Sequence, residues 1–292
     1  MEFGVVTMAL GPQGYSFEAG LSKFREIGFH HVLLIGRAGA KPVTSDGTSP
    51  DIMPDLLASD PEHVKKALRN AGLKLGSVYF AGKAGWMDLE SDRGAATTAA
   101  ALREFGGGAV ALGCKVLSHS VTSCGRSKAP TEEKADRIKR LAACMSETAA
   151  AFANNGLKVC VDVHHKAWVE GLEDCRLLVN SMTSPNAGIL MNIGHLTTAE
   201  AYGWLLIEEY PDRIPCVAWK DHSLAPDRPK PMWSIELGTG HSPFELYVRR
   251  FKEHPAERVH VINCENVPDE ERPAVLKRSL EYLKRLWEEC NV

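Results

Sequence analysis

The chain has 292 residues and a formal net charge of −3, with 34 Lys and Arg residues against 37 Asp and Glu residues. A chain of this length can bury a large hydrophobic core within one domain, because barrel folds often reach about 250 residues or more. The balanced charge offers no basic surface, so we expect neither nucleic acid nor an anionic membrane as a partner.

The first residues and the cysteines predict the compartment. Met1–Leu10 lacks a basic segment followed by an apolar one, and no apolar run approaches the length of a membrane span. We therefore expect a cytoplasmic protein. The eight cysteines are scattered and form no CxxC pair, which predicts reduced, buried thiols.

Short apolar segments alternate with longer helical segments along the whole chain. Each strand candidate is largely unbroken by polar residues, as expected for parallel strands that are covered on both faces. The candidates are Val5–Met8, His31–Ile35, Lys74–Phe80, Lys115–His119, Lys158–His164, Gly188–Asn192, Ile214–Lys220 and Arg258–Cys264. Eight strands in strict alternation with helices predict an α/β fold, a single (β/α)8 TIM barrel over residues 1–292.

Helix start signals lie between these strands. Asp60–Glu62 supplies an N-cap residue, a proline at the first helical position and an acid in the first turn. Thr197 with Glu200, and Ser242 with Glu245, have the spacing of a capping box. We therefore expect helices to begin at these three places.

The last helix and two long loops complete the pattern. Arg272–Cys290 has leucines at helical spacing, which predicts the final helix. The polar segments Arg37–Pro54 and Asp221–Gly240 predict long loops after strands. Loops of that length beside a compact core are often functional.

Polar residues stand at the ends of the last four predicted strands. These ends are Asp162–His165, Asn192–His195, Lys220–His222 and Asn263–Asn266. Because the reactive groups of a barrel come from the carboxyl ends of its strands, we expect these side chains to meet at one face. Alternation along the fifth strand directs Asp162 and His164 into the barrel mouth. The same alternation places Ala218 and Lys220 on one face of the seventh strand, and His222 shares that face if the strand continues so far.

In order and spacing these strand ends resemble the xylose isomerase-like TIM barrel superfamily, which includes the sugar phosphate isomerases and epimerases. The resemblance extends over the whole chain, including Gly238–Gly240 ahead of the last helix and strand. It implies a site in which a Glu, an Asp, a His and a Glu on strands five to eight hold a divalent metal. It also implies that the two Glu residues move protons at a carbon next to a carbonyl.

The match to the family's metal ligands is incomplete. Asp162 stands at the first Glu position, Asn192 replaces the Asp, Ala218 replaces the His, and Glu265 matches. The resemblance makes Asp162, Asn192 and Glu265 candidate ligands of Mn²⁺ or Mg²⁺. Such ions prefer charged oxygen ligands, so each lost charge weakens the site. The sequence leaves a metal-bound and a metal-free site open, and no nucleotide cofactor is expected.

The candidate catalytic residues are Asp162, Glu265 and Lys220. Two acids on nonadjacent strands that converge on one cavity suit general acid and base catalysis. The alternative is that each acid only pairs with Lys220, while Lys220 also has Asp221 beside it in sequence. The candidate substrate-binding residues are His164, His195, His222 and Trp168, with a purely structural role as the alternative for each.

We expect an isomerase, an epimerase or a lyase of the dehydratase kind that acts on a small polyhydroxylated carbonyl compound, a sugar or a cyclitol. A carboxylate would remove the proton next to the carbonyl, and a metal or Lys220 would stabilise the enediolate. The alternative function is a non-catalytic ligand-binding or regulatory barrel, motivated by Asn192 and Ala218. An endonuclease of the same superfamily is disfavoured by the negative net charge. Family members often form dimers or tetramers, so a homo-oligomer is left open.

Overall fold

Eight parallel strands close into a barrel in a computed structural model, which describes residues 1–11, 14–82, 85–121, 131–224 and 232–290. The strands follow one another around the barrel in chain order, and β1 pairs with both β2 and β10 to close it. Their bounds are β1 Gly4–Val6, β2 His31–Arg37, β3 Lys74–Ala81, β4 Val116–His119, β5 Lys158–Asp162, β6 Ala187–Asn192, β7 Cys216–Trp219 and β10 Val259–Ile262. The predicted (β/α)8 fold is confirmed, with each strand within a few residues of its expected position.

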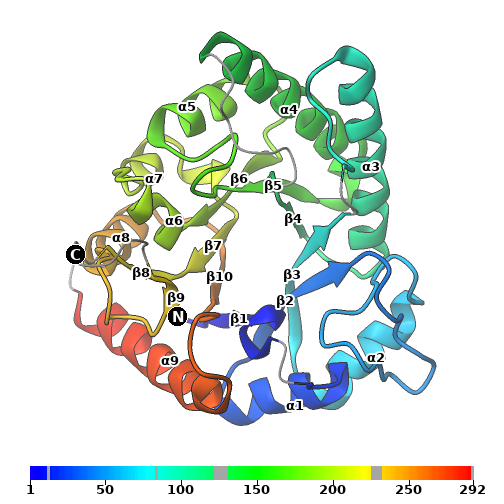
Figure 1. Cartoon of the computed structure of the whole chain (residues 1–292), viewed down its shortest axis with the longest axis vertical. Helices are drawn as coiled ribbons and strands as arrows, with labels where there is room; N and C mark the ends of the chain where they lie inside the picture. Colours follow the sequence, from blue (N-terminus) through cyan, green and yellow to red (C-terminus); the bar gives the residue numbers. More distant parts are fainter. Residues whose placement is uncertain (12–13, 83–84, 122–130, 225–231, 291–292) are drawn as a thin grey trace.

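Helices surround the barrel on its outside (Figure 1). Those described are α1 Phe17–Ile27, α2 Pro61–Ala71, α3 Asp92–Ala111, α4 Thr131–Ala151, α5 Leu172–Ser181, α6 Ile193–Thr198, α7 Leu205–Glu209, α8 Phe244–Glu253 and α9 Arg272–Glu289. Short 3-10 helices lie at η1 Thr7–Leu10, η3 Ala153–Asn155, η4 Pro211–Arg213 and η5 Asp269–Glu271. The chain leaves β1 directly into η1, which is why the first strand is shorter than its apolar run predicts.

Two of the three expected helix starts agree with the structure, at Asp60 and Ser242, and only Asp60 makes the expected capping hydrogen bond. Asp60 caps α2, since its side chain accepts a hydrogen bond of 2.8 Å from the Glu62 amide, and Pro61 follows at the first helical position. The capping box expected at Thr197 is wrong, because α6 begins at Ile193 and Thr197 already lies inside it. Its hydroxyl donates backward to the Ile193 carbonyl (2.9 Å).

The capping box expected at Ser242 is also wrong, although α8 begins close by, at Phe244. No side-chain hydrogen bond caps this helix. Ser242 instead directs its amide to Asp221 (3.0 Å) and its hydroxyl to the Lys220 carbonyl (3.3 Å). It therefore ties α8 to the end of β7 rather than capping the helix.

The segment predicted as a long loop after the seventh strand contains an antiparallel hairpin. Its strands are β8, Asp221–Ser223, and β9, Met232–Ile235. The residues between them, 225–231, lie outside the described part of the chain. The hairpin follows β7 directly, and its two strands form a small sheet separate from the barrel.

Alternation along the strands separates two packing regions. Val159 and Val161 face the helices and belong to the large outer core, whereas Cys160 belongs to a smaller cluster inside the barrel. The seven described cysteines are free and buried, as predicted, and Cys124 lies outside the described residues. The barrel interior is thus a packed core beneath the strand ends.

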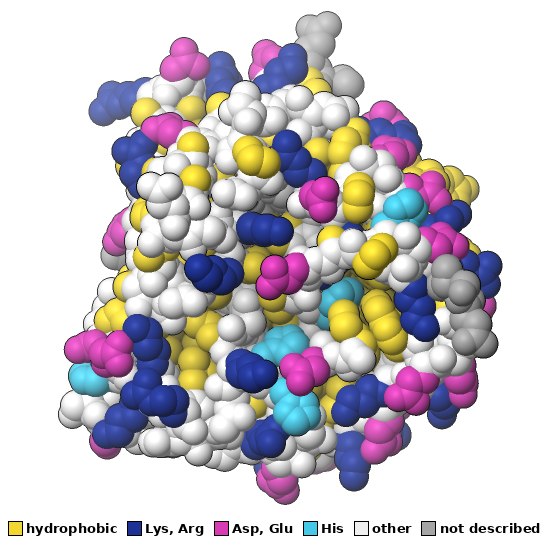
Figure 2. Space-filling view, turned by 180° about the vertical axis from the view of Figure 1, so that it is seen from behind, with side chains coloured by type: hydrophobic (Ala, Val, Ile, Leu, Met, Phe, Trp, Pro, Cys, Tyr) yellow, Lys and Arg dark blue, Asp and Glu magenta, His cyan; other side chains and the backbone are white. Residues whose placement is uncertain are grey.

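The outer surface mixes both signs of charge. Figure 2 shows the face seen from behind Figure 1, where basic and acidic side chains are interspersed among apolar ones. Within the described residues, no helix combines the length and the apolar character that crossing a membrane requires.

Candidate functional site

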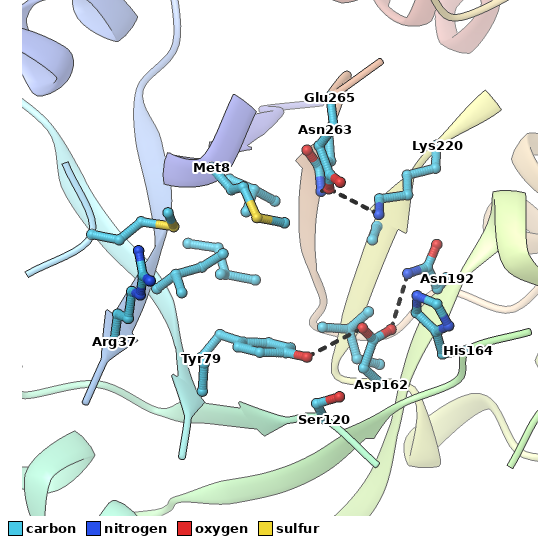
Figure 3. A pocket seen from close by; sticks show the side chains of 17 residues that line it. Met8, Arg37, Tyr79, Ser120, Asp162, His164, Asn192, Lys220, Asn263 and Glu265 are labelled. Atoms are coloured by element: carbon cyan, nitrogen blue, oxygen red, sulfur yellow. Dashed lines mark hydrogen bonds and ion pairs between the residues drawn. The ribbon is translucent and has the colours of Figure 1, made fainter. Parts of the chain in front are cut away.

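The carboxyl ends of the barrel strands surround a cavity of about 420 Å³ (Figure 3). Every strand, or the residues directly after it, contributes to its wall. The lining side chains are Val6, Met8, Leu33, Ile35, Arg37, Met53, Tyr79, Ala81, Ser120, Asp162, His164, Leu190, Asn192, Ala218, Lys220, Asn263 and Glu265. Asp162, Asn192, Lys220 and Glu265, each at a different strand end, therefore line one cavity.

The cavity has two chemically different sides. In Figure 3, Met8 and Arg37 lie across the cavity from Lys220, Asn192 and His164. The first side is mostly apolar, because the residues that alternation turns inward on β1 to β3 are mostly apolar. Arg37, the last residue of β2, adds a positive charge to this side. The opposite side, from β5 to β10, holds the carboxylates and amides.

Asp162 is a buried carboxylate at the end of β5. The Asn192 side chain donates a hydrogen bond of 3.0 Å to its Oδ1, and the Tyr79 hydroxyl lies 3.5 Å from its Oδ2. Burial raises the pKa of Asp162, although the charges of His164 and Lys220 and the Asn192 hydrogen bond oppose the rise. Asp162 therefore holds a proton more readily than a carboxyl group in water.

Glu265 has the opposite tendency. Its Oε1 lies 3.0 Å from the Lys220 ammonium, and it also accepts a hydrogen bond from the Asn263 side chain. Burial alone would raise the pKa of Glu265, but the charge and hydrogen bond of Lys220, together with the Asn263 hydrogen bond, lower it. One cavity thus contains one carboxyl group whose pKa is lowered and another whose pKa is raised.

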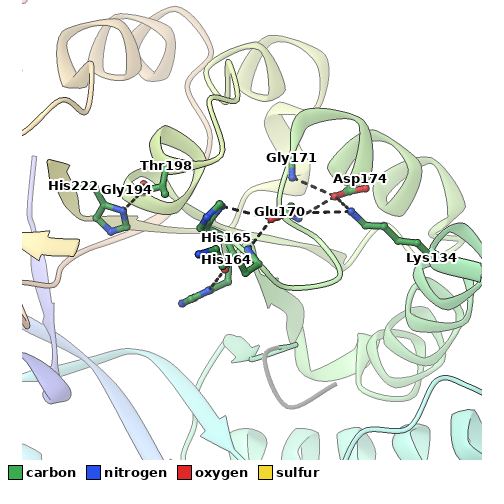
Figure 4. Close-up of polar contacts among 10 residues, drawn as sticks. Lys134, His164, His165, Glu170, Gly171, Asp174, Gly194, Thr198 and His222 are labelled. Atoms are coloured by element: carbon green, nitrogen blue, oxygen red, sulfur yellow. Dashed lines mark hydrogen bonds and ion pairs between the residues drawn. The ribbon is translucent and has the colours of Figure 1, made fainter. Parts of the chain in front are cut away.

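Three histidine rings pack in a row that begins at the polar side of the cavity and runs away from it. His164 lines the cavity, and its ring centroid is 3.5 Å from that of His195, which is 4.7 Å from that of His222. Burial lowers the pKa of His195 well below its usual value and that of His222 to about 3, so both are neutral near pH 7. His222 Nδ1 is 2.6 Å from the Thr198 hydroxyl (Figure 4).

Three of the predicted substrate-binding residues are not among those that line the cavity. His195 and His222 are packed behind His164. Trp168 is buried elsewhere, with the Arg137 guanidinium 4.3 Å from its ring. Of the four candidates, only His164 faces the cavity.

Lys220 and its sequence neighbour Asp221 have different partners. Lys220 pairs with Glu265, whereas the buried Asp221 carboxylate accepts the amide hydrogens of Gly238 (2.9 Å), Gly240 (2.8 Å) and Ser242 (3.0 Å). A Cβ atom at Gly240 would collide with that carboxylate. Asp221 therefore holds the Gly238–Gly240 turn in place.

Sequence reasoning gave no role to four polar residues of the wall: Arg37, Tyr79, Ser120 and Asn263. Asn263 shares its face with Glu265 two residues later, so alternation could have identified it. Its Oδ1 and that of Asn192 are buried without a partner among the described residues. Burial raises the pKa of Tyr79 well above its usual value, with the nearby Asp162 charge adding to the effect, so the phenol stays a donor.

The family resemblance implies a divalent metal at this site, but the donors present do not fit one. Asn192 contributes one neutral oxygen, Ala218 contributes none, and the Lys220 ammonium stands 3.0 Å from the Glu265 carboxylate. Among the residues that the structure describes, no three His, Cys, Asp or Glu side chains are grouped so that they could hold a metal ion. A divalent cation needs several oxygen ligands and is repelled by an ammonium group.

Comparisons with known proteins agree with the barrel. Residues 21–286 match the family model described as xylose isomerase-like TIM barrel. A search of curated proteins finds no sequence match.

Similar solved structures share the fold at low sequence identity. An L-ribulose 3-epimerase is 15% identical, with a TM-score of 0.74 over 99% of this chain and 96% of that one. A 3-keto-D-glucoside 4-epimerase from E. coli is 14% identical, with a TM-score of 0.71 over 98% and 99%. The IOLI protein with a bound zinc atom is 12% identical, with a TM-score of 0.74 over 100% and 99%. Because the family match covers most of the chain and the closed barrel agrees with it, the chain belongs to the xylose isomerase-like TIM barrel family.

Proposed function

We propose that this protein is an epimerase or isomerase of a small polyhydroxylated carbonyl compound, with Asp162 and Glu265 as its proton-transfer pair. The observation that carries the proposal is that two carboxylates in different surroundings line one cavity: Glu265 is paired with Lys220, whereas Asp162 is buried beside the neutral Asn192. Their pKa values are displaced in opposite directions. Such a pair supplies an acid and a base at the same pH. The epimerase names of the two fold relatives support the same reaction class.

The reaction is a proton transfer at a carbon next to a carbonyl. Glu265, which is ionised, removes the proton, and the electron pair moves through the new carbon–carbon double bond to the carbonyl oxygen. Lys220 stabilises the negative charge of this enediolate, since it lies beside Glu265. Asp162 returns a proton to carbon, and exchange with water resets both carboxyl groups.

Two buried amide oxygens favour a substrate with hydroxyl groups. Asn192 Oδ1 and Asn263 Oδ1 belong to residues that line the cavity, and neither has a partner in the described chain. A buried acceptor without a donor is costly, so hydroxyl groups of a ligand would satisfy both. We propose a small sugar with a keto group as the substrate class.

Solvent exchange tests this function even when the product is unidentified. Each ketose of a panel of ketopentoses, ketohexoses and 3-keto-glucosides is incubated in D₂O, and loss of the carbon-bound proton is followed by NMR. We expect exchange with the natural protein and with Glu147→Gln, which alters an exposed carboxylate on α4. Glu265→Gln should slow exchange by about 10² to 10⁴, because Glu265 removes the proton. Exchange that is absent for the whole panel, or equal in Glu265→Gln, contradicts the proposal.

A non-catalytic ligand-binding barrel is the second candidate function. The observation that favours it is the loss of donors at Asn192 and Ala218, two of the four positions at which the family resemblance implies metal ligands. This candidate predicts that a ketose binds in calorimetry while its proton never exchanges.

A further inference from the structure

A second cavity of about 530 Å³ adjoins the catalytic one. The two cavities share four lining residues: Met8, Arg37, Met53 and Glu265. Since the same side chains form part of both walls, one ligand can extend from the inner cavity into the outer one. The catalytic carboxylate Glu265 lies at this boundary.

Arg37 is the cation that both cavities share. It is the last residue of β2, and alternation with Leu33 and Ile35 directs it toward the barrel mouth. Its side chain is exposed, and in the part of the chain that the structure describes no ion pair involves it. A guanidinium group presents a planar fork of N–H donors that matches a carboxylate or a phosphate.

A second guanidinium group lies in the wall of the outer cavity. Arg272, at the start of α9, lines it with a side chain that is only 8% exposed. Its Nε is 2.9 Å from Asp269, and its Nη1 donates to the Ala9 carbonyl (3.4 Å). Asp269 balances the charge of Arg272, and these contacts hold its guanidinium group in the same cavity wall as the more accessible Arg37.

The acidic residues of the outer cavity already have partners. Asp51 Oδ2 accepts a hydrogen bond of 2.8 Å from the Lys41 amide, and Glu265 pairs with Lys220. Among the described residues of this wall, Arg37 is therefore the charged side chain for which no ion pair or hydrogen bond is found.

We infer that Arg37, assisted by Arg272, forms an anion subsite, and that the substrate of the proposed epimerase carries a carboxylate or phosphate group at the end away from the reacting carbon. This inference rests on the proposed function for the identity of the reacting end. The carbonyl end lies between Asp162 and Glu265, the chain of the substrate passes Met8 and Met53, and the anionic end reaches Arg37. Arg37 is thus a specificity residue and takes no part in the proton transfer.

Binding of inorganic phosphate tests the subsite independently of catalysis. Calorimetry compares the natural protein with Arg37→Gln, Arg37→Lys and the control Arg69→Gln, which removes the same charge from an exposed position on α2. We expect Arg37→Gln to weaken phosphate binding at least about tenfold, Arg37→Lys to retain part of it, and Arg69→Gln to leave it unchanged. No binding to the natural protein, equal binding by Arg37→Gln, or equal loss in Arg69→Gln overturns the inference.

Turnover of matched substrates separates the two proposals and the two kinds of anion. The exchange assay compares a ketose with its terminal phosphate ester and with the acid in which a carboxylate replaces the terminal carbinol. We expect one of the two anions to be preferred, and Arg37→Gln to abolish that preference through KM with kcat retained. If the neutral ketose reacts as well as both anions, the subsite is wrong and the epimerase stands. If phosphate binding depends on Arg37 but no compound exchanges, the epimerase proposal fails and the anion subsite remains.

Discussion

Asp162 and Glu265 carry the same functional group, and their neighbours give them different acidities. Asp162 receives a hydrogen bond from the neutral Asn192 amide, which is too weak to cancel the rise in pKa that burial causes. Glu265 has the Lys220 ammonium group 3.0 Å away, and this contact outweighs the effect of burial on its pKa. The position of Lys220 therefore decides which carboxylate is the base.

Replacing Glu265 by Gln should remove the base and also disturb the ion pair. We expect turnover to fall by about 10² to 10⁴. Lys220 is 6% exposed and would lose its counterion, although the Gln oxygen can still accept a hydrogen bond, so unfolding free energy should fall by about 1–3 kcal/mol. Chemical denaturation and the exchange assay measure the two effects.

The double variant Glu265→Gln with Lys220→Met separates these effects. It removes both charges, so stability should recover while activity does not. Full exchange activity in folded Glu265→Gln would show that another group is the base.

At the scale of single elements, alternation is the part of the sequence that predicts best. It gave the correct inward residues wherever the strand is regular, including Asp162 on β5 and Ala218 on β7. It does not extend to His222, because β7 ends at Trp219 and the chain enters β8. It could not place His195 either, since α6 begins at Ile193 and changes the period from strand to helix.

The strand ends of β6 and β7 also decide metal affinity. Ala218 lines the cavity, so Ala218→His should point an imidazole into it, and Asn192→Asp should restore a carboxylate. We expect the double variant to bind Mn²⁺ at least about tenfold more tightly than the natural protein, because two ligands and one negative charge are added. Calorimetry with Mn²⁺ measures this, with Ala218→Leu as the control for filling the cavity. Equal binding by all three proteins would show that the Lys220–Glu265 pair, rather than the missing ligands, prevents metal binding.

At the scale of the whole molecule, the barrel buries histidines at several strand ends and starts. His119 ends β4, His260 lies near the start of β10 and His222 lies in the β8–β9 hairpin, and each is at most 2% exposed. Burial lowers the pKa of His119 to about 4 and the pKa values of His222 and His260 to about 3. The folded protein therefore keeps all three neutral in mildly acidic solution, whereas the unfolded chain protonates them near pH 6.5.

This difference predicts a specific loss of stability in acid. Between about pH 6.5 and each folded-state pKa, the unfolded chain binds more protons than the folded protein does. The stability is therefore fully present above that pH range and falls as the pH is lowered through it. Each fully buried histidine contributes up to about 1.4 kcal/mol for every pH unit. Urea denaturation at pH 7, 6 and 5 should show this decline. His119→Phe, which keeps a ring in the same place, should decline less steeply, whereas His30→Gln, at an exposed position, should decline as the natural protein does. The same slope in His119→Phe as in the natural protein would mean that His119 does not stay neutral inside the fold, and that other groups cause the acid sensitivity.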